Sequence, residues 1–404
     1  MVNWKSSTEL YDRSINLCGF VSDSLLIVYF SYAYKGLWVA MKLNSLTQFA
    51  VSLIAFASFL FFTPSVLALD TWKILEFEFE GETLNGVLNL PKTDDVKGIV
   101  LIIHGYGETN AVKHNWYADM RSTIVDAGFA TYMWDKMGCG DSTGSFNINQ
   151  EVGNSADEAI AAIKMLREQN IPGAHTIGLW GGSRAGWINP LIIKKRSAIA
   201  FWVSISGVDD KENFRYLLEK NLVIEGLSKK KAQLIAKEWQ QGMLIAHQGG
   251  SYWDYKVATK NLAENEFWLK FTNGGFGFFS YYFLRYSLSD KVFDSETGLQ
   301  VHVENLDTLL RELDIPVLAL FGELDMNVDW RQTRSLYQKT IEPSLLTVAS
   351  FKQCNHSIFE ATTGGYYEFA DGTKPYKRCD GFLETASDWL NALELWRRRT
   401  FQKE

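Results

Sequence analysis

Between residues 98 and 207, apolar runs of strand length alternate with segments that have helical spacing. The apolar runs are nearly continuous, which is the pattern of parallel strands buried on both faces. They are "GIVLIIHGYG" (98–107), "FATYMWD" (129–135), "HTIGLWG" (175–181) and "AIAFWVSISG" (198–207). Strands that alternate with helices need crossover connections, so this stretch predicts a mostly parallel sheet covered by helices on both faces.

The clearest of the intervening helices is "NSADEAIAAIKMLREQN" (154–170). Ser155 is its predicted N-cap, with acidic residues in the first turn and basic residues near the end. A second helix is predicted over 183–195, although Pro190 lies inside it and should kink it.

The alternation is interrupted once. Residues 208–312 contain charged helical stretches and an aromatic block, "FTNGGFGFFSYYFLRYSL" (271–288), before the strand "IPVLALFGELD" restores the pattern. We therefore expect one α/β domain whose sheet opens with an antiparallel hairpin. Its core comprises 69–207 and 313–404, and its insertion, 208–312, forms a helical cap.

The N-terminal region has the form of a secretory signal. Residues 41–68 contain a lysine after Met41, an apolar run and the small-residue site "VLA", so we expect cleavage after Ala68. Met41 is then the expected start, with residues 1–40 an upstream extension. The alternative is an uncleaved N-terminal anchor. Either alternative predicts export, to the periplasm or outside the cell.

Charge and cysteine content narrow the function classes. The net charge is −7 without a basic block, which argues against a nucleic-acid partner, and the cysteine spacing is unlike that of a zinc site. An exported chain can form one disulfide among Cys139, Cys354 and Cys379. We favour Cys354–Cys379, since it would fix the loop that carries His356, and other pairings stay open.

Two serines lie in candidate nucleophile motifs. "GDSTG" (140–144) has the literal G-x-S-x-G spacing around Ser142, whereas "WGGSRAGW" (180–187) has Ala185 in place of the second glycine. A nucleophile elbow is a sharp turn from a strand directly into a helix. A polar loop follows Ser142, which predicts a solvated turn, whereas a strand precedes Ser183 and an apolar helix follows it. Ser183 is therefore the predicted nucleophile.

A serine nucleophile needs a base and an orienting carboxylate. His356 lies in the loop after a late strand, "LLTVASF", and is the predicted base. Asp325, where the chain leaves the preceding strand, is the predicted acid. Asp329 is the alternative, but it is expected to begin the next helix in a capping box with Gln332.

Two backbone N–H groups should bind the developing oxyanion. One is the N–H of Arg184, directly after the nucleophile. The other is predicted from the glycine-rich turn "HGYGE" (104–108), as the N–H of Tyr106.

The order Ser183, Asp325, His356, with "HGYGE" upstream and an insertion before the acid, resembles the α/β-hydrolase superfamily. Within it, the chain is similar to the serine aminopeptidase and monoacylglycerol-lipase-like branch, in which a helical cap lies between the sixth and seventh core strands. "WDKMGCGDSTG" (134–144) resembles that branch's D-x-x-G-x-G-x-S-x-G segment, which accounts for the motif at Ser142. Ala185 and the unmatched cap sequence depart from the pattern.

The resemblance implies a serine hydrolase without a metal or organic cofactor. A carboxylesterase or lipase-like activity on a small, apolar or aromatic acyl substrate is expected first, because the cap is apolar and aromatic. A serine aminopeptidase is the alternative, and it would need a cap acid to hold the substrate amine. A non-catalytic binding protein is a third. Membrane contact is expected only through an uncleaved N-terminal segment.

Overall fold

The computed structural model describes residues 72–195, 198–209, 211 and 213–401. The predicted signal peptide (41–68), the upstream extension and the expected start at Met41 lie outside the described residues. The described part of the chain contains no helix that is long and apolar enough to cross a membrane.

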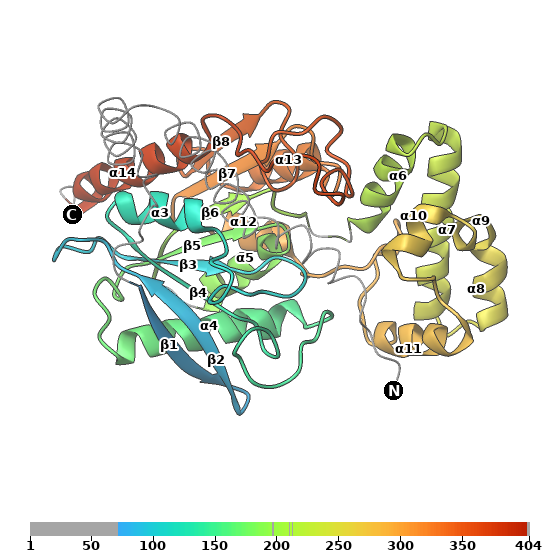
Figure 1. The fold of residues 1–404 in the computed structure, drawn as a ribbon, viewed down its shortest axis with the longest axis horizontal. Coiled ribbons are helices and arrows are strands. Elements are labelled where there is room, and N and C mark those ends of the chain that lie inside the picture. The colour runs from blue at the N-terminus through green and yellow to red at the C-terminus, as the bar shows by residue number, and fades with distance from the viewer. Residues whose placement is uncertain (1–71, 196–197, 210, 212, 402–404) are drawn as a thin grey trace, which may run out of the picture.

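An eight-stranded sheet forms the centre of the molecule, with strand order β1-β2-β4-β3-β5-β6-β7-β8 (Figure 1). β1 and β2 form the predicted antiparallel hairpin, β2 pairs antiparallel with β4, and the other neighbours are parallel. The strands are β1 (Trp72–Phe79), β2 (Glu82–Asn89), β3 (Ile99–Ile103), β4 (Ala130–Trp134), β5 (Ile177–Gly182), β6 (Ile199–Ile205), β7 (Val317–Gly322) and β8 (Leu346–Phe351). The predicted mostly parallel sheet is confirmed.

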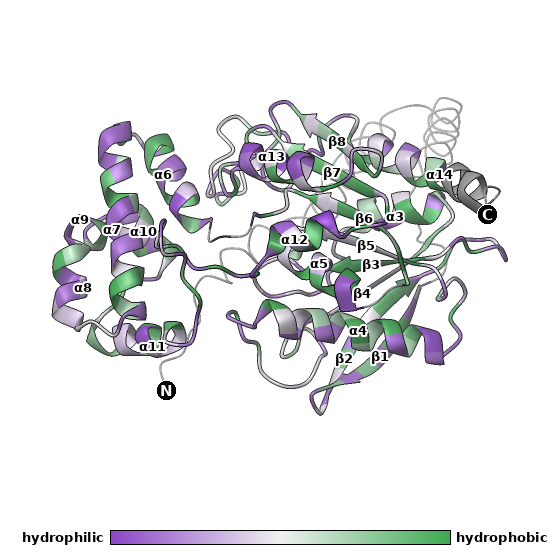
Figure 2. Ribbon diagram, turned by 180° about the vertical axis from the view of Figure 1, so that it is seen from behind, coloured by the Kyte–Doolittle hydropathy of each residue, from purple (hydrophilic) through white to green (hydrophobic). Residues whose placement is uncertain are grey.

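Helices cover both faces of this sheet and build a separate hydrophobic core on each. α3 (Ala118–Asp126) and α14 (Phe382–Phe401) pack together on one face. The other face is covered by α4 (Val152–Glu168), α5 (Ala185–Lys195), α12 (Leu306–Arg311) and α13 (Trp330–Thr340). Every residue of β3 and β4 is buried, and β3 is hydrophobic along its whole length, as expected of a central parallel strand (Figure 2).

A helical lobe lies between β6 and β7 in the sequence and beside the sheet in space (Figure 1). Its elements are α6 (Phe214–Ile224), α7 (Lys229–His247), α8 (Tyr252–Ala258), α9 (Lys260–Ala263), α10 (Glu266–Phe271) and α11 (Phe278–Leu288). We call this lobe the cap. It has its own apolar core, to which α6, α7 and α10 contribute. Its first helix reaches the segment after β7, where the hydroxyl of Tyr216 donates to the carbonyl of Asp325 over 3.1 Å.

One predicted helix start and one predicted capping box are wrong. α4 begins one turn earlier than predicted, with Glu151 at the N-cap position and without an acidic residue in its first turn. Ser155 lies inside the helix, where its hydroxyl bonds back to the carbonyl of Glu151 over 3.2 Å and so cannot cap the end. Asp329 is at the N-cap of α13, but its side chain makes no capping hydrogen bond, so the predicted capping box with Gln332 does not form.

Candidate active site

Ser183 lies on the turn between β5, which ends at Gly182, and α5, which begins at Ala185. Its φ of 54° is in the left-handed region, which is unfavourable for a serine and is found where a functional turn imposes it. The N–H of Ser183 donates to the carbonyl of Ile205 over 2.9 Å, which fixes the turn against β6. A Cβ on Gly181 would lie 2.5 Å from the Cβ of Ala185, so the turn needs a glycine there.

Ser142 occupies a different environment. It lies in an exposed turn, as predicted, since Gly140, Asp141, Thr143 and Gly144 are exposed, but the side chain of Ser142 itself is buried. Its hydroxyl donates to the carbonyl of Asp135 over 2.7 Å and accepts a hydrogen bond from the N–H of Asn85 over 2.9 Å. These bonds tie the turn after β4 to β2, which gives the Ser142 hydroxyl a structural use.

Asp325 and His356 meet beyond the carboxyl ends of β7 and β8. Nδ1 of His356 lies 2.7 Å from Oδ2 of Asp325, whose side chain is fully buried. The other carboxylate oxygen accepts the N–H groups of Asn327 and Val328 over 2.8 and 2.9 Å. Asp325 is therefore held from both sides, with one oxygen left for the imidazole.

The loop that carries His356 crosses directly over the end of β7. A Cβ on Gly322 would come within 2.4 Å of the carbonyl oxygen of Cys354, so glycine permits this approach. The side chain of Asn355 accepts the N–H groups of Ser357 and Phe359, each over 3.0 Å. This turn sets the backbone on both sides of His356.

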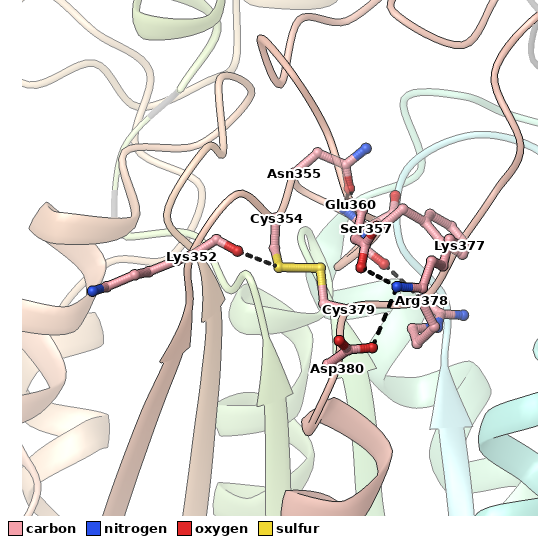
Figure 3. The surroundings of a disulfide bond; sticks show 10 residues. Lys352, Cys354, Asn355, Ser357, Glu360, Lys377, Arg378, Cys379 and Asp380 are labelled. Atoms are coloured by element: carbon pink, nitrogen blue, oxygen red, sulfur yellow. Dashed lines mark hydrogen bonds and ion pairs between the residues drawn. A yellow bond between two sulfur atoms is a disulfide. The ribbon is translucent and has the colours of Figure 1, made fainter.

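A disulfide fixes the same loop. Cys354 and Cys379 are bonded, which confirms the favoured pairing, and Cys139 is a buried free thiol. Figure 3 shows the bond joining the segment after β8 to the segment before α14. Arg378, next to Cys379, donates to the carbonyl of Ser357 over 2.7 Å, so the two segments are held twice.

The predicted oxyanion loop lies beside the nucleophile turn. A Cβ on Gly105 would lie 3.6 Å from the carbonyl oxygen of Gly182 and 3.9 Å from Cβ of Ser183. Tyr106, the next residue, has an exposed side chain. The N–H of Arg184 has no hydrogen-bond partner among the described residues, as a donor reserved for a ligand would require.

The five predicted site residues therefore lie at one edge of the sheet. Ser183 follows β5, Asp325 follows β7 and His356 follows β8, and the carboxyl ends of parallel strands share an edge. Among the described residues, no hydrogen bond joins the hydroxyl of Ser183 to the His356 ring. Hydrogen bonds of this kind are often longer in ligand-free enzymes than in their complexes.

The sequence analysis missed a buried polar cluster beneath the nucleophile turn. This cluster lines a cavity with room for about one water molecule. Its members are Lys136, Glu158, His104 and the side chain of Arg184. Nε2 of His104 lies 2.6 Å from the carbonyl of Trp134, and burial, ahead of the charge of Lys136, lowers the pKa of His104 well below its ordinary value. Burial also raises the pKa of the Glu158 carboxyl and lowers that of the Lys136 ammonium to about 8.

The described part of the chain contains no cluster of three or more histidine, cysteine or acidic side chains that could hold a metal ion. The aromatic block of the cap is largely exposed along α11, where Phe279, Phe283 and Tyr286 point outward, and Tyr281 is buried within the cap.

We compared the chain with known protein families, curated sequences and solved structures. The family model described as serine aminopeptidase, S33, matches residues 94–222, which include β3 to β6 and most of α6. No curated protein sequence matches the chain.

Three similar solved structures have low sequence identity. An esterase of Pyrococcus furiosus has a TM-score of 0.46 at 12% identity over 82% of this chain and 92% of its own. An esterase of Butyrivibrio proteoclasticus with bound ferulic acid has a TM-score of 0.45 at 15% identity, over 80% of this chain and 98% of its own. A proline iminopeptidase of Mycobacterium smegmatis has a TM-score of 0.46 at 14% identity, over 80% of this chain and all of its own.

The family model matches the part of the chain that contains the oxyanion loop and the Ser183 turn. The sheet continues from that part with β7 and β8 in parallel, after a helical insertion, and helices cover both faces. The match to the serine aminopeptidase, S33, model over residues 94–222, together with the sheet order and the two helical layers, supports an α/β-hydrolase fold for this chain.

Proposed function

We propose that the protein is a serine hydrolase that cleaves ester-type acyl bonds through an acyl-enzyme on Ser183. The observation that carries this proposal is the Asp325–His356 contact of 2.7 Å at the sheet edge where Ser183 occupies a strained strand-to-helix turn. A strained serine and a histidine oriented by a buried carboxylate are the parts that nucleophilic acyl transfer needs.

In the proposed mechanism, Nε2 of His356 takes the proton of the Ser183 hydroxyl as its oxygen attacks the acyl carbonyl. Asp325 accepts the Nδ1 proton of the imidazole, fixes its tautomer and stabilises the imidazolium that forms. The N–H groups of Tyr106 and Arg184 hold the oxyanion of the tetrahedral intermediate. The imidazolium then protonates the leaving alcohol, and water, activated by His356, releases the acid and restores Ser183.

An aminopeptidase is the second candidate, because the matching family model bears that description. It would require an acidic side chain of the cap to bind the substrate amine. Glu238 is instead committed to the N–H groups of Asn261 and Leu262, each over 2.9 Å, and Asp254 forms a capping box with Ser251. These two acids are engaged within the cap, and we place esterase activity first, on an apolar or aromatic acyl group, because the sequence of the cap is apolar and aromatic.

Export belongs to the same proposal. The signal-like segment of residues 41–68 motivates it, and the Cys354–Cys379 disulfide is consistent with an oxidising compartment. N-terminal sequencing of the protein recovered outside the cytoplasm tests it, with a mature chain beginning at Leu69 expected.

The function is tested with a ladder of p-nitrophenyl esters and a panel of aminoacyl p-nitroanilides. The full chain is compared with Ser183→Ala and Ser142→Ala. Ester turnover that disappears only in Ser183→Ala supports the proposal, and anilide turnover would move the function to a peptidase. A fluorophosphonate probe that labels neither serine of the folded wild-type protein would point to a non-catalytic binding protein.

A further inference from the structure

Lys136 makes contacts that set it apart from the other lysines of the described chain. Its ammonium group donates to two carbonyl oxygens of the oxyanion loop, Gly105 over 2.8 Å and Gly107 over 2.6 Å. The side chain comes from the segment after β4 and is 7% exposed. A charged group on a neutral, glycine-rich loop at this depth calls for a functional reason, because burying an ammonium group is costly.

The first of these carbonyls belongs to a peptide unit with a proposed role. The carbonyl of Gly105 and the N–H of Tyr106 are the two ends of one planar peptide. The described residues have no cis peptide bond, and in a trans unit the two groups point in opposite directions. Holding the carbonyl of Gly105 therefore sets the direction of the Tyr106 N–H.

We propose that Lys136 is a positioning residue of the oxyanion site, which holds the Gly105–Tyr106 peptide so that the Tyr106 N–H faces the reacting acyl oxygen. This proposal rests on the proposed function, in which that N–H is one of the two oxyanion donors.

The loop needs such an anchor because of its composition. Gly105 and Gly107 flank Tyr106, and Gly107 has a φ of 91°. Glycines give the backbone access to many conformations, so an unanchored peptide could turn its N–H away from the site. Two hydrogen bonds from one cation fix both sides of Tyr106, and charge-assisted bonds are stronger than neutral ones.

The surroundings keep Lys136 in place. Burial lowers the pKa of its ammonium group to about 8, with the charge of Arg184 acting in the same direction and Glu158 against it. The carboxylate of Glu158 lines the same cavity and is itself fixed by Trp134 Nε1 over 2.6 Å and Gln150 Nε2 over 2.8 Å. A carboxylate held in this way beside the same cavity favours the charged form of the lysine.

The test compares Lys136→Met, which keeps the length of the side chain without a donor, with Lys136→Arg, which keeps a cationic donor. Lys113→Met is the matched control, since Lys113 is exposed and bonds Asp141 instead of the oxyanion loop. Thermal melting establishes that each full-length variant is folded, and kcat and KM are measured with p-nitrophenyl butyrate.

We expect Lys136→Met to lower kcat about 10²–10³-fold, the effect of losing one oxyanion donor, with KM changed less than about threefold. The kcat of Lys136→Arg should be at least about tenfold higher than that of Lys136→Met. The kcat of Lys113→Met should match that of the wild type. The affinity for a short alkylboronic acid, whose adduct on Ser183 places an oxygen in the oxyanion site, should fall in parallel with kcat/KM.

Retention of wild-type kcat in folded Lys136→Met would overturn the proposal, as would a loss confined to KM. If neither Lys136 variant melts cooperatively, Lys136 is required for folding and the proposal is also overturned. Failure of the proposed function itself would give a different result. The wild-type protein would then neither hydrolyse esters nor react with a fluorophosphonate at Ser183. The positioning role would then fall with it.

Discussion

The carboxylate of Asp325 lies 2.7 Å from Nδ1 of His356 and has no exposed surface. Its second oxygen accepts two backbone N–H groups of the turn that follows it. The turn therefore holds the carboxylate rigidly with one oxygen aimed at the imidazole. Such an arrangement selects the tautomer in which Nε2 is free to accept a proton.

Replacing Asp325 with asparagine should lower kcat by about 10⁴-fold, because the amide can donate to Nδ1 and stabilise the wrong tautomer. Ester hydrolysis at saturating substrate measures this loss. Asp329→Asn is the matched control, because Asp329 is the alternative candidate for the acid and its side chain makes no capping bond. A larger loss of kcat in Asp329→Asn than in Asp325→Asn would show that Asp329, and not Asp325, is the acid.

Replacing Ser183 should affect activity, whereas replacing Ser142 should affect stability. Ser183→Ala should abolish fluorophosphonate labelling and reduce kcat by about 10⁶-fold, with the thermal transition retained. Ser142→Ala should keep its kcat but lose about 1–3 kcal/mol of unfolding free energy, because it leaves the part-buried Asn85 N–H and the buried Asp135 carbonyl without the Ser142 hydroxyl. Urea unfolding beside active-site titration measures both, and labelling that survives in Ser183→Ala would contradict the assignment.

Much of the sheet could be predicted because each buried strand is a continuous apolar run that local sequence reveals. The turn at Ser183 could be predicted for the same reason, since a strand, glycines and a helix adjoin it. The turn at Ser142 is exposed as predicted, but the burial of its hydroxyl could not be predicted, because it depends on Asn85, which lies 57 residues earlier in the chain. Local composition carries no signal for such a contact.

Single buried charges are equally hard to predict. Lys136 and Glu158 belong to no periodic pattern, and both are residue types normally found on the surface. Their burial follows from the way α4 and the segment after β4 pack beneath the nucleophile turn. The start of α4 was misplaced because Ser155 suits an N-cap by type, although its hydroxyl bonds back into the helix.

The disulfide should contribute mainly to stability. Replacing Cys354 and Cys379 together with serine should lower the free energy of unfolding by about 3 kcal/mol, since the bond closes a loop of 25 residues in the unfolded chain. The Asn355 turn and the Asp325 contact remain, so kcat at 25 °C should fall no more than about tenfold. Urea unfolding and ester hydrolysis of the double variant measure the two effects. A loss of activity comparable to that of Asp325→Asn would make the disulfide essential to the placement of His356.

Glu368 holds together the loop that follows His356. Its carboxylate accepts the N–H groups of Thr362 over 2.6 Å and Gly364 over 2.7 Å, and it pairs with Lys374 over 2.7 Å. The next residue back, Tyr367, packs its ring against Phe267 of the cap. The loop therefore contacts the cap through Tyr367, while its own hydrogen bonds converge on the carboxylate of Glu368.

Glu368 should make the stability of the protein depend on acid pH. Burial opposes ionisation of its carboxyl, but hydrogen bonds from Lys374, Thr362 and Thr363 outweigh it and lower the pKa to about 2, from 4.5. Because the folded pKa lies below the unfolded one, this contribution is complete above pH 4.5 and is lost as the pH falls toward 2. Glu368→Gln should lower the Tm at pH 7 and flatten the dependence of Tm on pH in this window. Glu360→Gln is the control, because the exposed pair that Glu360 forms with Lys377 should contribute little. If the Tm of the wild type and that of Glu368→Gln depended equally on acid pH, other carboxylates would be responsible for that dependence.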